Sequence, residues 1–216
     1  MKEFLRRNKY AALFSYFIIY LIWFQLLEVH ATPIFYTHCK LDDLIPFCAW
    51  FLIPYLLWFP YVGVTLGAIY MKSKPEFCRL CIRLFSGMTI CLIIYSIFPS
   101  GQLLRPDLSA DQTLLSGLVS QLYQLDSSTN VCPSIHVYNT LCIHYTLCTW
   151  DQTKQKKWLK LGSSLLMILI IASTVLLKQH SVIDGFAAIG LWIIIECALQ
   201  WGISRQKQRQ LGGLSA

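Results

Sequence analysis

Six stretches of mostly apolar residues alternate with polar segments along this chain. An α-helix rises 1.5 Å per residue, so about 20 apolar residues cross the roughly 30 Å hydrocarbon core of a bilayer. The pattern therefore predicts six transmembrane helices. They cover residues 10–27, 44–71, 80–98, 133–150, 159–177 and 182–203.

The fourth stretch is the least hydrophobic of the six. It contains several polar residues, namely Ser134, His136, Asn139, Thr140, His144 and Thr146. A helix of this composition is expected to be buried among its neighbours or to line a cavity. The connection before it, residues 99–132, is too polar to span a membrane and longer than most structureless loops. We expect this loop to cover or build a functional site.

Composition supports an integral membrane protein. Hydrophobic residues make up 56% of the 216 positions and charged residues 13%, which is far from the balance of a soluble domain. The expected fold is all-α, a six-helix membrane bundle formed by a single domain over residues 1–216, with its core at about 80–203. The nine cysteines lie mostly in apolar stretches and are expected to pack as small apolar side chains. Cys78 and Cys81 form a lone pair, and no metal site is predicted.

The basic residues predict the orientation in the membrane. Of the 18 lysines and arginines, only Lys40, Arg105 and Lys178 fall in the first, third and fifth loops. Cytoplasmic segments carry the excess of basic residues, so both termini should be cytoplasmic and these three loops should face outward. The net charge of +7 then reflects topology, and a nucleic acid partner is not expected.

This topology places the candidate functional residues on one side. They are Arg105, Ser134, His136, Lys178, His180 and Asp184. If the last helix starts at Val182, His180 and Asp184 are four residues apart, so the carboxylate can hold one imidazole nitrogen and leave the other basic. Two histidines beside cations suit phosphoryl transfer, in which one attacks phosphorus and the other protonates the leaving oxygen. Alternatively, these polar residues merely end one helix and begin the next.

Three short motifs add a family resemblance. Arg105-Pro106, Cys132-Pro133-Ser134-Ile135-His136 and Ser173-x6-His180-x3-Asp184 resemble the three-part signature of the type 2 phosphatidic acid phosphatase superfamily. This resemblance implies that His180 is the nucleophile, Asp184 its orienting carboxylate and His136 the general acid. It also implies that Arg105 and Ser134 bind the phosphate of a lipid substrate, without a metal or other cofactor. The site would face outward, from a plasma membrane.

The chain departs from the family motifs at three positions. Phe98 and Thr174 stand where the family has a lysine and an arginine, and Ile135 replaces a glycine. Lys178 could replace one of the missing phosphate cations, since lysine binds phosphate as a point charge. In having no glycine at position 135, the chain resembles the transferase-like branch of the family. The departures leave open which lipid is used and whether water or an alcohol accepts the phosphate.

Two other classes of function remain possible on the sequence. One is a small transporter or anion-binding protein whose histidines carry protons, and the other is a catalytically inactive relative of the family. His144 is expected to be a hydrogen-bonded interior residue. Glu196 and Arg83 lie at a similar depth, which predicts a structural ion pair. The oligomeric state is open.

Overall fold

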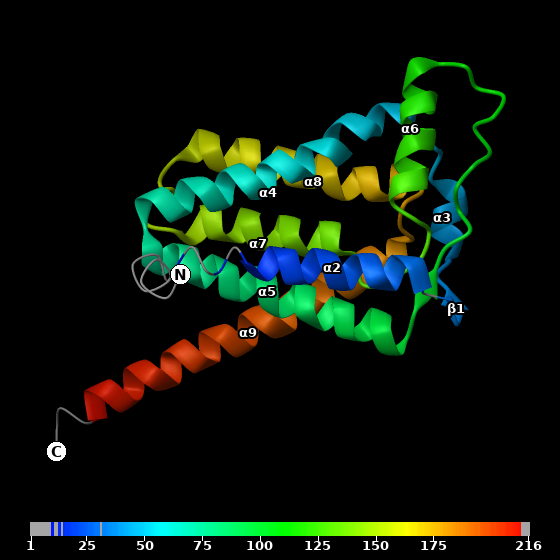
Figure 1. Cartoon of the computed structure of the whole chain (residues 1–216). Coiled ribbons are helices and arrows are strands. Elements are labelled where there is room, and N and C mark those ends of the chain that lie inside the picture. The colour runs from blue at the N-terminus through cyan, green and yellow to red at the C-terminus, as the bar shows by residue number, and fades with distance from the viewer. Residues whose placement is uncertain (1–9, 11–12, 14, 31, 213–216) are drawn as a thin grey trace.

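Helices make up most of the chain, as the sequence predicts. The computed structural model describes residues 10, 13, 15–30 and 32–212. The helices of this part are α2 (Ser15–His30), α3 (Lys40–Leu44), the 3-10 turn η2 (Ala49–Phe51), α4 (Leu52–Lys72), α5 (Lys74–Ile97), α6 (Leu114–Leu125), α7 (Ile135–Thr149), α8 (Lys157–Leu176) and α9 (Val182–Gly212). Figure 1 shows α2, α4, α5, α7 and α8 lying along a common direction, with α6 standing across one end and α9 extending away at the other.

Within the described residues, four helical segments are long and apolar enough to cross a membrane. They are Ala49–Lys72, Lys74–Ile97, Lys157–Leu176 and Val182–Arg205. Helix α2 is apolar but has 16 residues, and α7 has 15, so they measure roughly 24 and 22 Å. The length and composition of these helices are those of a membrane protein. The count of six spans and the cytoplasmic location of the termini stay predictions.

The break between α4 and α5 is shorter than the sequence pattern indicates. Ser73 alone separates the two helices, and its side chain caps α5 by accepting a hydrogen bond from the Glu76 backbone nitrogen at 3.4 Å. Pro75 lies in the first turn of α5, where its missing N–H costs no intrahelical bond. For this reason α5 begins at Lys74, six residues before the predicted start at residue 80.

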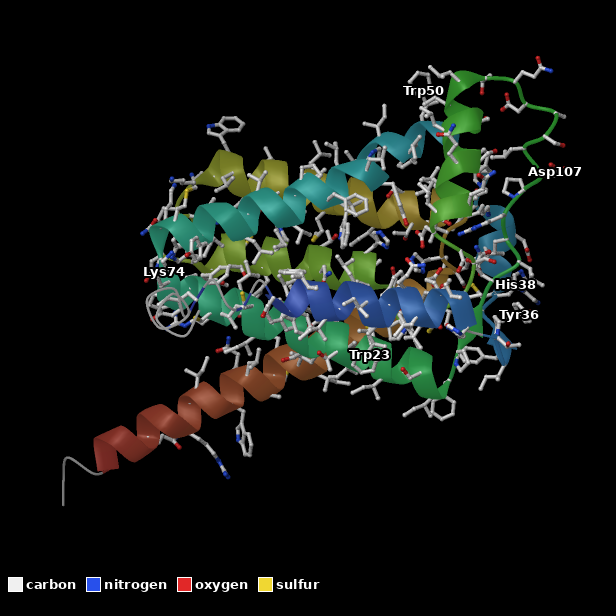
Figure 2. The ribbon with its side chains drawn as sticks, viewed as in Figure 1. Trp23, Tyr36, His38, Trp50, Lys74 and Asp107 are labelled. Atoms are coloured by element: carbon white, nitrogen blue, oxygen red, sulfur yellow. The ribbon has the colours of Figure 1, made fainter. Side chains whose placement is uncertain are left out.

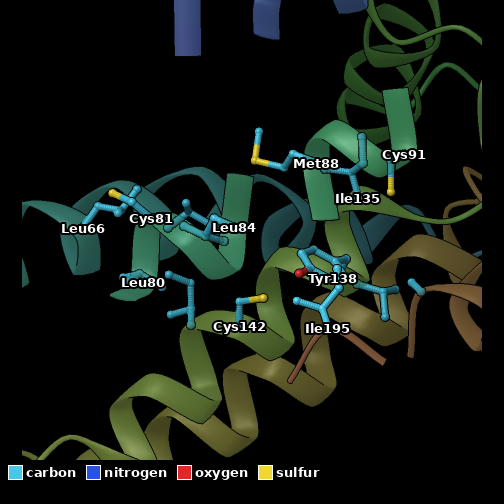
Figure 3. Close-up of a cluster of buried hydrophobic side chains, with 14 of the residues drawn as sticks. Leu66, Leu80, Cys81, Leu84, Met88, Cys91, Ile135, Tyr138, Cys142 and Ile195 are labelled. Carbon is cyan, nitrogen blue, oxygen red and sulfur yellow. The ribbon is translucent and has the colours of Figure 1, made fainter. Parts of the chain in front are cut away.

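Helix α7 lies at the centre of the bundle, as its polar composition predicts. Val137, Tyr138, Cys142 and Ile143 on this helix are fully buried. Tyr138 packs so closely on α5 that a Cβ at Gly87 would lie 2.0 Å from the tyrosine Cζ. The Tyr138 hydroxyl donates a hydrogen bond to the Arg83 carbonyl of α5 at 2.7 Å. Figure 3 shows Tyr138 and Cys142 facing the α5 side chains of this buried cluster.

Two polar contacts inside the bundle confirm predictions made from the sequence. Arg83 on α5 binds Glu196 on α9 through Nε and Nη2, at 2.9 and 3.3 Å, and both side chains are buried. His144 Nδ1 lies 2.9 Å from the Ser163 hydroxyl, which in turn lies 2.6 Å from the Tyr61 hydroxyl. Arg83 and Glu196 therefore form a structural ion pair, and His144 is a hydrogen-bonded interior residue.

The first, third and fifth connections meet at one end of the bundle. The short strands β1 (Phe35–Tyr36) and β2 (Ser100–Gly101) pair in parallel and join the first connection to the third. Gln102 Nε2 donates to the Lys178 carbonyl at 2.8 Å and so joins the third to the fifth. Figure 2 shows Tyr36, His38 and Asp107 at this end, and Lys74 at the opposite one. The candidate residues of all three connections therefore share one end of the molecule.

Candidate active site

His180 lies in the tight turn between α8 and α9. The backbone nitrogens of Gln179 and His180 both donate to the Thr174 carbonyl at 3.0 Å, and Lys178 has a positive φ of 53°. A left-handed residue of this kind ends a helix by turning the chain back over its last carbonyls. The turn therefore presents the imidazole of His180 to the centre of this end of the bundle.

The imidazole of His180 has two acceptors at the same ring nitrogen. Its Nδ1 lies 3.0 Å from the Val131 carbonyl and 3.4 Å from Oδ2 of Asp184. The same carboxylate oxygen accepts the backbone N–H of Ser181 at 2.9 Å, and Asp184 is fully buried. Because both neighbours of Nδ1 are acceptors, Nδ1 carries the proton and Nε2 keeps its lone pair. The structure thus brings His180 and Asp184 together as the sequence predicts.

His136 is the second histidine of the site. It lies in the first turn of α7, and its ring centroid is 5.8 Å from that of His180. On its other sides the imidazole contacts two aromatic rings of α4, with centroid distances of 4.7 Å to Tyr55 and 4.5 Å to Trp58. The indole Nε1 of Trp58 is buried and has no hydrogen-bond partner in the described part of the chain. The sequence did not point to either aromatic residue.

Ser134 connects the two histidine segments. Its side chain caps α7 by accepting the Val137 backbone N–H at 3.5 Å, and its own backbone N–H donates to the Asp184 carbonyl at 3.1 Å. The residue is fully buried. A hydroxyl that accepts one bond can still donate its proton to another acceptor. Ser134 is therefore placed to fix the start of α7 against the start of α9.

Arg105 reaches the site from the third connection. Its guanidinium donates to the backbone carbonyls of Tyr123, Asp126 and Ser127 at 3.0, 2.7 and 2.8 Å, and also to Oε1 of Gln179. Its Nε is buried and has no partner among the described residues. Burial lowers the pKa of Arg105, although a guanidinium stays protonated at ordinary pH. Three of these four hydrogen bonds therefore hold the loop, and the buried Nε–H is left without a partner among the described residues.

Lys178 does not point toward the histidines. Its Nζ donates to the backbone carbonyls of Asp42 and Ile45, at 2.7 and 2.5 Å, and the residue is buried. The ammonium thus fastens the α3 segment to the turn between α8 and α9. Two of its three N–H groups are engaged in this way, so the geometry gives Lys178 a structural role, and its role as a phosphate ligand stays an unsupported prediction.

Asp126 is a carboxylate of the site that sequence reasoning missed. Its Oδ2 accepts the Tyr55 hydroxyl at 2.6 Å and the Gln179 side-chain amide at 3.2 Å. Gln179 also accepts from Arg105, and the Tyr55 ring lies against His136. Asp126 therefore connects the arginine to the aromatic wall of the second histidine. Asp126 lies in a polar loop, six residues before Cys132, and no motif or spacing in the sequence marks it as a site residue.

Asp42 is a second missed carboxylate. Its Oδ1 accepts the Val182 backbone N–H at 2.8 Å, and its Oδ2 accepts the Ser181 hydroxyl at 2.6 Å and the Cys39 backbone N–H at 2.8 Å. Burial raises the pKa of Asp42, but these three hydrogen bonds outweigh burial and hold the pKa below its ordinary value. Asp42 therefore caps α9 from a distant part of the chain and supports the turn that carries His180.

An apolar groove lies beside the turn that joins α8 to α9. It has a volume of about 330 Å³ and lies between α8 and α9, with Val137, Thr174, Val182 and Phe186 among its walls. A second pocket of about 410 Å³ lies at the other end of the bundle, between α4 and the start of α8, and neither histidine lines the groove or this pocket. No group of three His, Cys, Asp or Glu residues suited to a metal ion occurs in the described ranges.

Comparison with known proteins gave one match. A family model described as PAP2 superfamily matches residues 79–206, which is more than half of the chain. The matched range runs from the first turns of α5 to the last turns of α9 and contains Arg105, Ser134, His136, His180 and Asp184. Searches among curated proteins and among solved structures gave no match.

Proposed function

The chain belongs to the PAP2 superfamily, and we propose that it is a membrane enzyme that cleaves or transfers the phosphate group of a lipid. The observation that carries this proposal is the histidine pair, in which Nδ1 of His180 is held by two acceptors and the ring faces His136 at 5.8 Å between centroids. One ring is thereby kept as a nucleophile, and the other lies near enough to exchange a proton with a group bound between them.

In the proposed first step, Nε2 of His180 attacks phosphorus and the bond from phosphorus to the leaving lipid oxygen breaks. His136, protonated, gives its proton to that oxygen. Positive charge appears on the His180 ring as the N–P bond forms, and the Asp184 carboxylate stabilises it. The free Nε–H of Arg105 and the Ser134 hydroxyl are the donors proposed for the phosphate oxygens.

In the second step, an oxygen nucleophile attacks the phosphohistidine. The nucleophile is water or an alcohol, its proton passes to His136, and the N–P bond breaks to restore both imidazoles. The apolar groove beside Thr174 and Val182 supports a lipid substrate, because its walls suit a hydrocarbon chain. The distribution of basic residues in the sequence supports a site on the outer face of the membrane, which we propose to be a plasma membrane.

An inactive relative of the family is the second candidate. The observation that favours it is that both cations already have partners, since most of the hydrogen bonds of Arg105 and Lys178 go to backbone carbonyls. Neither Phe98, which is exposed, nor Thr174, whose hydroxyl donates to the Ile171 carbonyl, supplies another positive charge. Trapping of the covalent intermediate distinguishes this candidate from an active enzyme.

The test uses the purified full chain with radiolabelled phosphatidic acid and phosphatidylglycerol, quenched in base to preserve an acid-labile phosphohistidine. We expect label on the wild type and none on His180→Ala. His38→Ala is the matched control, since His38 also pairs with an aspartate but is exposed in the first connection. His136→Ala should still form the intermediate with an aryl phosphate, whose good leaving group departs without a proton. Absence of label from the wild type with every substrate would support the inactive relative.

A further inference from the structure

The pocket between α4 and α8 lies at the end of the bundle away from the histidines. It has a volume of about 410 Å³, and its walls come from α4, from the end of α7 with the connection that follows, and from the start of α8. His136 lies in the first turn of α7, whereas Trp150, which lines the pocket, directly follows the last turn, roughly 21 Å away along the helix. The pocket is therefore separate from the candidate active site.

This pocket lies between two segments that are long and apolar enough to cross a membrane, Ala49–Lys72 and Lys157–Leu176. They lie side by side (Figure 1). Gly162 leaves a gap between them, since it is exposed and a Cβ there would meet no atom within 4 Å. Along α4 the wall runs roughly 16 Å from Tyr61 to Lys72, which is about half of the roughly 30 Å hydrocarbon core of a bilayer. This length suits one acyl chain of a lipid from a single leaflet.

The hydroxyl groups of Tyr61, Ser163 and Thr153 on the walls already have partners within the chain. The Tyr61 hydroxyl lies 2.6 Å from that of Ser163, which also lies 2.9 Å from His144 Nδ1. The Thr153 hydroxyl donates to backbone carbonyls at 2.8 and 3.2 Å. Much of the remaining wall is apolar and includes Val64, Ala68 and Leu166. The inside of the pocket therefore suits a hydrocarbon chain.

The rim of the pocket is positively charged. Lys72 is the last residue of α4 and Lys156 directly precedes α8, and both are exposed. Neither ammonium group has a hydrogen bond or an ion pair with another residue of the described ranges. The carboxylates of Asp151 and Glu76 near this end are paired with other basic side chains. Trp158, which is 85% exposed, completes the rim with an indole ring of the kind that is enriched at membrane interfaces.

We propose that this pocket binds one phospholipid whose headgroup carries a net negative charge, taken from the leaflet that meets this end of the bundle. The lipid phosphate lies between the ammonium groups of Lys72 and Lys156, and one acyl chain lies along the gap at Gly162. Lipid fills any gap between membrane helices that opens to the bilayer, and the basic rim determines which lipid fills this one. The bound lipid stabilises the packing of α4 on α8 by mass action. These two helices also carry the aromatic contacts of His136 and the turn that holds His180.

The test is native mass spectrometry of the full chain in detergent, which counts bound lipids and gives a dissociation constant for each. The probes are dioleoyl phosphatidylglycerol, which is anionic, and dioleoyl phosphatidylcholine, which has the same chains and no net charge. We expect the first phosphatidylglycerol to bind at least 10-fold more tightly than the first phosphatidylcholine, because each lysine near the headgroup contributes roughly 5-fold. The same preference in His180→Ala separates this lipid from one held or consumed at the histidines.

Two pairs of variants locate the lipid. Lys156→Gln should raise the dissociation constant of phosphatidylglycerol by roughly 5-fold. Lys157→Gln removes an exposed lysine that is next in sequence but outside the walls, and it should change the constant by less than about 2-fold. Gly162→Leu fills the gap and should weaken binding by at least 10-fold. Gly63→Leu is its matched control, because Gly63 is also exposed, meets no atom within 4 Å of an added Cβ and lies outside the walls.

Several results would overturn the proposal without touching the phosphohistidine reaction. They are equal binding of the two lipids by the wild type, a constant that Gly162→Leu leaves within about 2-fold, and loss of the preference in His180→Ala. Equal effects of Lys156→Gln and Lys157→Gln would mean that diffuse surface charge holds the lipid, and they also contradict a site in the pocket. Thermal unfolding in detergent shows whether Gly162→Leu is folded. If it is not, the preference of the wild type and the two lysine variants decide the question.

Discussion

Replacement of Asp184 by asparagine isolates the electrostatic part of the proposed mechanism. The change removes the negative charge beside His180 and keeps the size of the side chain. Oδ2 of Asp184 lies 3.4 Å from His180 Nδ1, but the Val131 carbonyl lies closer, at 3.0 Å. This carbonyl can still accept the Nδ1 proton in the variant. We therefore expect His180 to keep the tautomer with a free Nε2 and to lose only the stabilisation of its positive charge.

The distance gives the size of the effect. Two unit charges 3.4 Å apart interact by about 5 kcal/mol at an effective dielectric constant near 20. If the imidazole carries about half of a positive charge in the transition state, the carboxylate contributes about 2.5 kcal/mol. Since each 1.36 kcal/mol is a factor of ten in rate, Asp184→Asn should form the phosphohistidine roughly 70-fold more slowly than the wild type.

Rapid-quench measurement of phosphoenzyme formation in a single turnover checks this value. The matched control is Asp43→Asn, because Asp43 also lies beside a histidine nitrogen, 2.8 Å from His38 Nε2, but at the surface. A loss below about 5-fold would mean that the buried charge does not act on the reaction. A loss as large as that of His180→Ala would mean that the Val131 carbonyl cannot hold the tautomer by itself, and would contradict a purely electrostatic role of Asp184.

Three further predictions concern the stability of the fold and its orientation in the membrane. Gly87→Ala places a Cβ 2.0 Å from Cζ of Tyr138, and overpacking of this kind should cost about 1–3 kcal/mol and lower the melting temperature in detergent, whereas Gly67→Ala, which meets no atom within 4 Å, should not. Asp42→Ala leaves one buried donor, the Ser181 hydroxyl, and two partly buried backbone N–H groups unpaired, and should cost on the order of 1–3 kcal/mol. Because the folded-state pKa of Asp42 is below the ordinary 3.8, the wild type has this stability in full above pH 3.8 and loses it as the pH falls through the folded-state pKa, so the gap between the two melting curves should close in acid. A cysteine that replaces the exposed Asp107 should react with a membrane-impermeant maleimide added outside intact cells, to a greater extent than the wild type does. A cysteine that replaces the exposed Gln155 should react only after lysis, and the reverse order would contradict the outward orientation.

The helices of the bundle could be predicted from the sequence because they follow from short-range patterns, and the clustering of the histidines could be predicted from the topology that the basic residues indicate. Long apolar stretches predict helices wherever they occur, and the polar composition of residues 133–150 predicts that α7 is central. The pairing of Arg83 with Glu196 was also predictable, since each is an ionisable group at the same depth that needs a partner. The i,i+4 spacing predicts the contact between His180 and Asp184 for the same local reason.

The carboxylates of the site could not be predicted in this way. Asp42 contacts Ser181 across 139 residues, and Asp126 contacts Tyr55 across 71. A single aspartate in a polar loop has no period and no motif, so its partner depends on how distant loops pack. Lys178 shows the same limit, since its left-handed backbone at the end of α8 determines where the side chain points, and no local pattern indicates a left-handed residue that is not glycine.

The contacts of Arg105 connect the fold of the third loop to the chemistry of the site. A guanidinium surrounded by the carbonyls of Tyr123, Asp126 and Ser127 cannot move without breaking the hydrogen bonds to the loop, so its unpartnered Nε–H is fixed in direction before any substrate arrives. A fixed donor needs no reorganisation when charge builds on a phosphate oxygen, which is the condition for strong electrostatic stabilisation. The same contacts bring the side chain of Asp126 to the site, because its backbone carbonyl is one of the ligands of Arg105. The loop therefore supplies one oriented cation together with one carboxylate to the site.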